Sequence, residues 1–249
     1  MNVALASLAG LLIFLWPFLG LGPVGPVPAL AVAGGTVLGL GLVELGTRRL
    51  DSRRLALLAA LAAIDSALRL ALVSGIGGFS PVFFPILCAG YALGPSFGFL
   101  TGATSLFLSA LVTGGVGPWL PYQVFAAGWV GLAAGVAGRS SRSVWVLALV
   151  GCLAGYGFGV AMDTWDWTFF AGSPGVGWEP GLAPLTSLHR FAAFYLLTSA
   201  AYDTFRAVGN VALVLLFAPA LLAALRRIRS RFTVEVIPLA EREVSPLTS

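Results

Sequence analysis

Two sets of charged and polar side chains interrupt the apolar runs of this sequence at helical spacing. Asp65 and Arg69 lie four residues apart, so on a helix they project from the same side and can pair. Ionisable residues inside membrane helices are costly, and they usually form ion pairs or mark a functional site. The second set has the spacing i, i+4, i+7 and i+11 and comprises Ser199, Asp203, Arg206 and Asn210. Each set alone is compatible with a structural role, but together they predict a polar cavity that opens outward and binds a ligand.

Catalytic chemistry has little support in these residues. The stretch "DTWD" at 163–166 and the nearby His189 could act on a lipid phosphate by acid–base or metal-assisted catalysis. However, the sequence has one histidine, no HExxH, no Ser–His–Asp arrangement and no GxxxxGK[ST] nucleotide-binding motif. Cys88 and Cys152 lie inside apolar runs, as buried thiols usually do, and neither is a neighbour of the histidine. We therefore expect neither an enzyme nor a bound metal or cofactor.

The elements that position these residues are membrane helices. The chain is 58% hydrophobic and 10% charged, with a mean hydropathy of +0.95, whereas soluble domains carry about 25% charged residues. Runs of about 20 apolar residues predict transmembrane helices, and Gly- and Pro-rich breakers separate them. The predicted fold class is an all-α integral membrane protein, with helices at 3–20, 28–46, 54–73, 79–94, 96–113, 122–137, 144–162 and 189–225.

Arginines predict the orientation of these helices. All basic residues other than His189 are arginines, and they cluster at helix ends, so the net charge of +4 does not suggest a nucleic-acid partner. With eight spans all the clusters fall on one side, which the positive-inside rule makes cytoplasmic, together with both termini. The clusters are Arg48, Arg49, Arg53 and Arg54; Arg139 and Arg142; and Arg226, Arg227, Arg229 and Arg231.

The last predicted helix, 189–225, is too long for a single span. At 1.5 Å per residue it would measure about 55 Å, against a hydrocarbon core of about 30 Å. Counting back from Arg226, we expect the span to begin near Arg206. Residues 189–205 should then lie at the outer surface or in a bent helix there.

Small residues mark faces where membrane helices approach closely. Alanines on one stripe of the helix 54–73 lie opposite Asp65 and Arg69, and they indicate either packing within this chain or docking of another protein. Glycines recur at similar spacing in 90–102 and 128–138, where we predict that they pack helices together. The alanines are Ala56, Ala60, Ala63, Ala67 and Ala71, and the glycines are Gly90, Gly94, Gly98, Gly102, Gly128, Gly131, Gly135 and Gly138.

The stretch 77–135, "GGFSPVFFPILCAGYALGPSFGFLTGATSLFLSALVTGGVGPWLPYQVFAAGWVGLAAG", resembles the substrate-specific subunit of energy-coupling factor (ECF) transporters. The features that carry the resemblance are an alanine-rich first core helix, a proline-started second helix, a Gly-Pro turn, a glycine-rich third helix and "GPWLPYQ" before the fourth. The resemblance covers 54–231 and implies a six-helix bundle that binds substrate. Residues 1–47 would then be two additional N-terminal helices, and 232–249 a polar cytoplasmic tail.

The resemblance also implies a mechanism. Such subunits bind a vitamin or related micronutrient on the outer side of the bacterial plasma membrane and dock on a membrane coupling protein that sits on two ABC-type ATPases. Ala56, Ala60, Ala63 and Ala67 correspond to the alanines that face the coupling protein in the family. The loops 74–80, 113–121 and 163–188 correspond to those that close over the ligand. The implied ligand contacts, besides the two polar sets above, are Trp119, Gln123, Asp163, Trp165, Trp167 and Arg190, with Asp166 and Trp178 beside them.

The identity of the ligand stays open at this point. Aromatic residues around a polar cavity suit a compound with rings, and cobalamin or a corrinoid precursor is our leading hypothesis. Thiamine, riboflavin, biotin, folate and a queuosine precursor also fit. The tryptophans in 163–188 have an alternative role as anchors at the membrane interface. A small secondary transporter or channel is the alternative function, although the sequence shows no convincing internal repeat.

Overall fold

The computed structural model describes residues 3–19, 25–47, 50–71 and 79–230. Predictions for Arg48, Arg49, Arg231, most of the loop 74–80 and the tail 232–249 lie outside these residues. The elements in chain order are α1 (Val3–Leu15), α2 (Pro26–Gly46), α3 (Ser52–Ala71), α4 (Phe83–Leu93), α5 (Pro95–Thr113), α6 (Leu120–Ser140), α7 (Val144–Asp166), the 3-10 helix η1 (Trp167–Phe170), α8 (Pro184–Thr198) and α9 (Ala200–Ser230).

Every predicted span contains a helix, and five helices are long and apolar enough to cross a membrane. These are α2, α5, α6, α7 together with η1, and α9. Helices α1 and α4 are apolar but shorter, and α3 has 20 residues but carries four charged side chains, Arg53, Arg54, Asp65 and Arg69. The chain is therefore a multi-pass membrane protein. That α1, α3 and α4 also cross the membrane stays a prediction.

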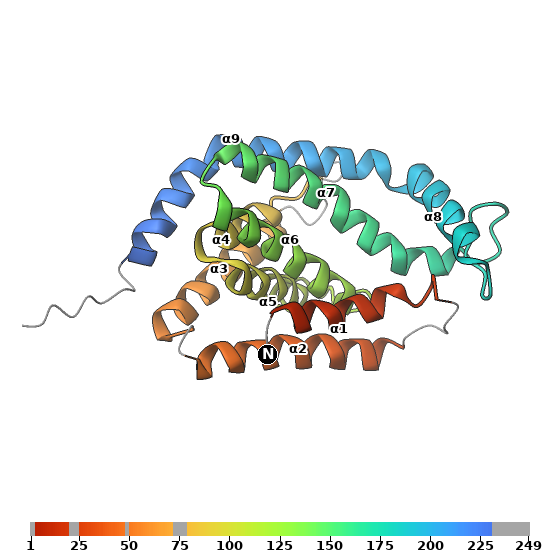
Figure 1. The fold of residues 1–249 in the computed structure, drawn as a ribbon, viewed down its shortest axis with the longest axis horizontal. Helices are drawn as coiled ribbons and strands as arrows, with labels where there is room; N and C mark the ends of the chain where they lie inside the picture. The colour runs from red at the N-terminus through yellow and green to blue at the C-terminus, as the bar shows by residue number, and fades with distance from the viewer. Residues whose placement is uncertain (1–2, 20–24, 48–49, 72–78, 231–249) are drawn as a thin grey trace, which may run out of the picture.

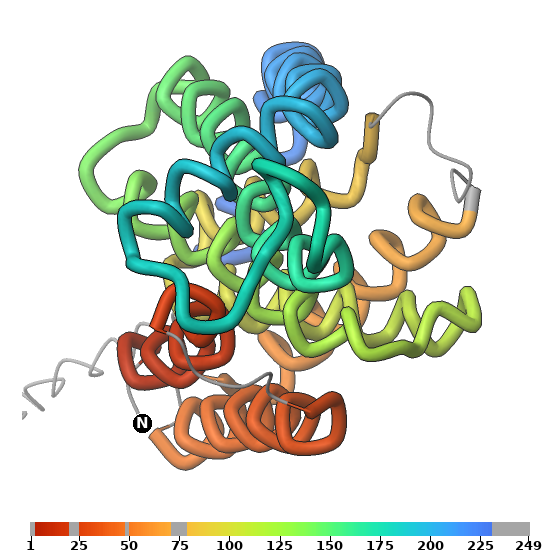
Figure 2. Tube along the Cα trace, turned by 90° about the vertical axis from the view of Figure 1, so that its right-hand side faces the viewer, coloured from red at the N-terminus to blue at the C-terminus, as the bar shows by residue number. Residues whose placement is uncertain are grey.

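The helices form a bundle in which α6 is central. In Figure 1, α1 and α2 lie along the lower side, α7, α8 and α9 lie along the upper side, and α3 to α6 lie between them. Helix α6 contacts α5, α4, α7, α2 and α1, whereas α3 packs mainly against α5. Viewed from the end, α3 lies at the edge of the bundle, at the right of Figure 2.

The predicted glycine packing is confirmed where α6 meets α4 and α5. A side chain on Gly98 or on Gly90 would overlap the carbonyl oxygen of Gly131, and one on Gly102 would overlap that of Ala127. Gly94, between α4 and α5, has φ of 105°, which an L side chain rarely adopts. Its N–H donates to the Gly90 carbonyl at 2.8 Å and closes the tight turn.

Most of the described arginines lie near one end of the bundle. The connections from α2 to α3 and from α6 to α7, and the end of α9, lie at this "arginine end", at the left of Figure 1. Helix α8 and η1 lie at the opposite end, which we call the "aromatic end". This arrangement matches the pattern from which the orientation was predicted. The assignment of the arginine end to the cytoplasm remains a prediction.

One predicted boundary near the aromatic end is wrong, and one predicted bend is present. The segment 163–188 is not all loop, because α7 continues to Asp166 and η1 follows to Phe170. A helix satisfies its own backbone hydrogen bonds, so it can extend past the apolar residues into the polar interface. The segment 189–225 is divided at Ser199, as the predicted bent helix would be, and α9 begins at Ala200. That its membrane span begins near Arg206 stays a prediction.

Candidate functional site

An aromatic cluster joins α6 to α7 at the aromatic end. The ring centroids of Trp119 and Trp165 lie 6.0 Å apart, and those of Tyr122 and Trp165 lie 6.1 Å apart. Phe169 in η1 lies 4.7 Å from Trp165. Trp119 and Trp165 are both half-buried, so part of each ring is accessible. The structure thus brings together two predicted site residues from distant parts of the chain. Sequence reasoning missed Tyr122 and Phe169, which are spaced one helical turn from Trp119 and Trp165.

Gln123 lies one turn after Trp119 on the same helix. Its side-chain Oε1 is buried and accepts no hydrogen bond from the described residues. The Trp119 indole N–H, in contrast, donates to the Gly115 carbonyl at 3.1 Å. A buried acceptor without a donor is costly, and a ligand N–H or O–H group would satisfy it.

We call residues 163–188 the "outer segment". Its other two tryptophans pack against the residues that follow α1. Trp167 is fully buried, its ring stacks on Phe18 at 5.8 Å, and its indole N–H donates to the Val176 carbonyl at 2.7 Å. Trp178 contacts Trp16 with ring centroids 5.5 Å apart. Its indole N–H donates to the Pro17 carbonyl at 3.2 Å. Neither indole N–H is free for a ligand, and Trp167 has no exposed ring.

Arg190, another predicted ligand contact, holds the outer segment in place. Its Nη1 pairs with the Glu179 carboxylate at 2.7 Å and donates to the Gly177 carbonyl at 3.3 Å. Both partners lie in the connection between η1 and α8. The contacts of Arg190 are therefore explained by the local fold.

The predicted polar stripe of α9 packs along α7 in what we call the "polar seam". Three glycines on α7 let the helices approach, and a side chain on Gly159 would overlap the Asp203 carboxylate. Going along the seam from the aromatic end, Ser199 donates to Asp163 at 2.8 Å, Asp203 sits against Gly159, Arg206 donates to the Gly155 carbonyl at 3.2 Å, and Asn210 donates to the Gly151 carbonyl at 2.9 Å.

Asp203 and Arg206 form a buried ion pair at the middle of the seam. The second Asp203 oxygen accepts a hydrogen bond from the Tyr195 hydroxyl at 3.1 Å. Burial and the adjacent Asp203 charge raise the pKa of Tyr195 above its usual range, so this hydroxyl stays a donor. The Arg206 guanidinium lies over the rings of Phe158 and Tyr202, at 5.4 and 5.1 Å from their centroids. These contacts compensate the charges inside the bundle.

The prediction that the two polar sets, on α3 and on α9, line one cavity is wrong for the described residues. Asp65 and Arg69 face α5, whereas the other set faces α7. The described residues show no close ion pair between Asp65 and Arg69, because Arg69 donates to Ser109 at 2.7 Å. The two opposite charges still attract each other, and the Ser105 hydroxyl lies beside Asp65. Helical spacing alone could not reveal which neighbour each stripe faces.

The four alanines Ala56, Ala60, Ala63 and Ala67 are all exposed on α3. We call them the "alanine stripe". The opposite side of the helix is buried at Leu58, Leu61, Ala62 and Asp65. Packing within the described part of this chain therefore does not account for the stripe.

Comparison with known protein families identifies the family of this chain. The family model described as "ECF transporter, substrate-specific component" matches residues 53–218, which is well over half of the chain. The chain belongs to this family. It is accordingly a substrate-specific membrane subunit, or S component, and S components are not enzymes. Comparison with curated proteins and with solved structures finds no match.

The match divides the S component into two parts. It begins at the start of α3 and ends within α9, so it contains the alanine stripe, the polar seam and the aromatic cluster around Trp165. Helices α1 and α2 precede it. Their sequence gave no indication of a role, but in the structure the end of α1 holds Trp167 and Trp178 through Trp16 and Phe18. The residues just after α1, which precede the family match, thus contact the outer segment.

Proposed function

We propose that this S component captures a vitamin or related micronutrient at the aromatic end for ATP-driven import. It then docks on a membrane coupling protein, and two ABC-type ATPases bound to that protein hydrolyse the ATP. The observation that carries the proposal is the exposed alanine stripe on a helix at the edge of the bundle. Small residues on a membrane helix permit close approach of another helix, and no described helix of this chain uses them.

The ligand contacts that we favour are aromatic rings and unsatisfied acceptors near the aromatic end. Trp119 and Trp165 offer partly exposed ring faces, and Gln123 offers a buried acceptor without a donor. Asp163 keeps its second carboxylate oxygen buried and unpartnered. Rings with a few polar groups between them suit a compound with flat ring systems. Cobalamin or a corrinoid precursor is the first compound to test.

We assign a supporting role to most of the other predicted contacts. Asp203, Arg206 and Asn210 hold α7 against α9, and Trp167 and Arg190 hold the outer segment. They position Asp163 and Trp165, both on the last turns of α7. We do not place Asp65 and Arg69 in this site, because both residues are on α3 and face α5 and not the aromatic cluster.

The ligand is tested by releasing it from protein purified gently from its native host. The protein is denatured, and the released small molecules are identified and counted by mass spectrometry. A stoichiometric vitamin-like compound supports the proposal and identifies the substrate. The variant Trp165→Ala should lose the compound, whereas Trp145→Ala, an exposed tryptophan at the other end of the same helix, should retain it. No released compound and no co-purifying ATPase would favour a small secondary transporter or channel.

Docking is tested with one substitution at two exposed alanines. Ala60→Trp on the stripe should prevent co-purification of the coupling protein and ATPases but leave ligand binding unchanged. Ala223→Trp is the matched control, since Ala223 is exposed on α9 and lies, like Ala60, within two turns of the arginine end. Equal recovery of the partners with both variants would exclude the stripe as the docking surface.

A further inference from the structure

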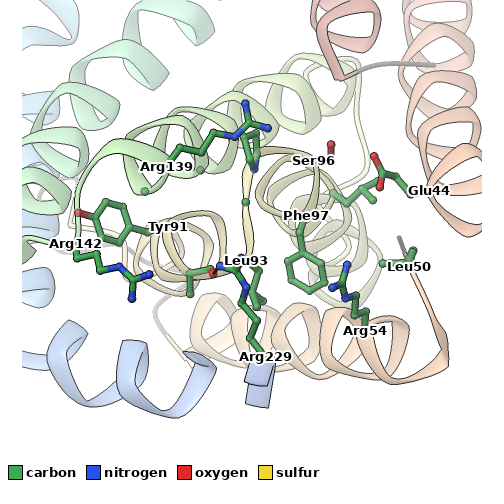
Figure 3. Close-up of a pocket in the computed structure, with 16 residues that line it drawn as sticks. Glu44, Leu50, Arg54, Tyr91, Leu93, Ser96, Phe97, Arg139, Arg142 and Arg229 are labelled. Carbon is green, nitrogen blue, oxygen red and sulfur yellow. Dashed lines mark hydrogen bonds between the residues drawn. The ribbon is translucent and has the colours of Figure 1, made fainter. Parts of the chain in front are cut away.

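The charged side chains that line a cavity at the arginine end are mainly positive. It has a volume of about 470 Å³, and it is bordered by the beginning of α3, the ends of α6 and α9 and the turn before α7. Figure 3 shows the arginines around it, with Arg142 and Glu44 on opposite sides. The charged lining residues are Arg54, Arg139, Arg142, Arg229 and Glu44, so four positive charges minus one negative charge leave a surplus of three.

The backbone adds to this positive charge. The cavity also reaches the first turn of α5, at Pro95, Ser96 and Phe97. The first amide of this turn that makes a described helical hydrogen bond is that of Gly98, which donates to Gly94 at 2.9 Å. The preceding amides lie at the positive end of the 19-residue helix. Arg229 is held in position, since its Nη1 donates to the Ala92 carbonyl at 2.9 Å.

An apolar groove leads away from this cavity between α1 and α6. Its nearer part, about 440 Å³, shares Arg139 and Pro95 with the arginine cavity. Its farther part, about 580 Å³, shares Leu11 and Val136 with the nearer part. The groove walls are otherwise formed by residues such as Val3, Leu8, Leu132 and Ala133. A basic cavity thus adjoins an apolar groove of the same bundle.

We propose that an anionic phospholipid occupies this composite site, with its phosphate headgroup in the arginine cavity and an acyl chain in the groove between α1 and α6. Basic pockets between transmembrane helices bind lipid headgroups through such charge complementarity. A free phosphate or an acidic protein segment would use the arginines but not the groove. The site is independent of the substrate at the aromatic end, and it gives α1, which lies outside the family match, a second role.

The test measures lipid retention by the full-length protein with native mass spectrometry. The probes are phosphatidylglycerol, phosphatidylcholine and inorganic phosphate, each added to delipidated protein in detergent. We expect selective retention of phosphatidylglycerol. The double variant Arg139→Gln, Arg142→Gln should weaken it on the order of tenfold, because each arginine near a lipid headgroup contributes several-fold to affinity. Arg227→Gln is the control, since Arg227 is exposed on α9 but does not line the arginine cavity.

A groove variant distinguishes a lipid from a soluble anion. Ala133→Phe narrows the farther groove, and Ala223→Phe places the same ring on an exposed alanine outside it. We expect Ala133→Phe, but not Ala223→Phe, to weaken the binding of phosphatidylglycerol. Equal retention of phosphatidylcholine, full competition by inorganic phosphate, or no effect of Ala133→Phe would each overturn the proposal. It would also be overturned if the arginine variants retained phosphatidylglycerol but no longer assembled with their partner proteins.

Discussion

Helices α3 and α6 carry the same kind of small-residue pattern but use it in different ways. On α6, Gly131 and Gly135 are buried, and any side chain there would overlap the backbone of α5 or of the turn before it. On α3, the alanine stripe is exposed. The pattern therefore identifies a face that can contact a helix, but it does not say whether that helix belongs to the same chain. The difference predicts that substitutions in α6 affect folding, while those in the stripe affect assembly.

The largest effect is expected where α6 touches α4 and α5. Gly131→Leu would force these backbones apart, and we expect a loss of about 3 kcal/mol or more in the free energy of unfolding. The loss of stability is measured by heating the protein in detergent and monitoring how much of it remains monodisperse. Gly157→Leu is the control, because a side chain on Gly157 meets open space. Equal melting temperatures for the two variants would mean that the contact between α6 and its neighbours tolerates separation.

The polar seam tests a second type of interface. Asp203→Ala leaves the Arg206 guanidinium buried without its carboxylate, which we expect to cost about 3 kcal/mol. Glu179→Ala removes the partner of Arg190 from an exposed pair and should change stability by less than about 1 kcal/mol. The same unfolding assay compares them. A seam variant as stable as the surface variant would show that Arg206 finds other partners.

The helices and the glycine contacts could be predicted from sequence because both depend on local spacing. Gly98 and Gly131 follow the spacing of close-packed membrane helices, and the structure places them in contact. The seam could not be predicted in the same way. The stripe containing Asp203 was recognised, but its partner is a row of glycines on α7, at Gly155 and Gly159, some 50 residues away. Without that pairing, a buried interface has the same sequence pattern as an open cavity.

The site residues at the aromatic end show the same limit at shorter range. Trp165 and Trp167 are two residues apart and equally aromatic, so both were predicted to contact the ligand. In the structure Trp165 faces Trp119 on α6, whereas Trp167 is enclosed by Phe18 and Phe191. Helix α7 ends and the 3-10 helix η1 begins between the two residues, so their side chains point in different directions. The contact with α1 depends on tertiary packing that spacing does not encode.

A smaller effect is expected farther along the seam. Asn210→Ala removes the hydrogen bond to the Gly151 carbonyl but also removes a buried Oδ1 that has no described partner. Interhelical hydrogen bonds in membrane proteins average about 0.6 kcal/mol, so we expect a loss of that order. Val208→Ala, on the exposed side of α9, is the reference for a substitution without such a contact. A loss several times larger would indicate that Asn210 organises the seam beyond this one bond.

The smallest effect on stability is expected in the alanine stripe. Ala63 is exposed, so Ala63→Leu should change the free energy of unfolding of the isolated protein by less than about 0.5 kcal/mol. The same change at Ala127 on α6, which is fully buried, should be strongly destabilising. Unfolding of both variants and co-purification of Ala63→Leu with the coupling protein test the comparison. If Ala63→Leu folds normally but fails to assemble, the small residues of α3 serve a partner helix; if it instead unfolds, they serve this chain.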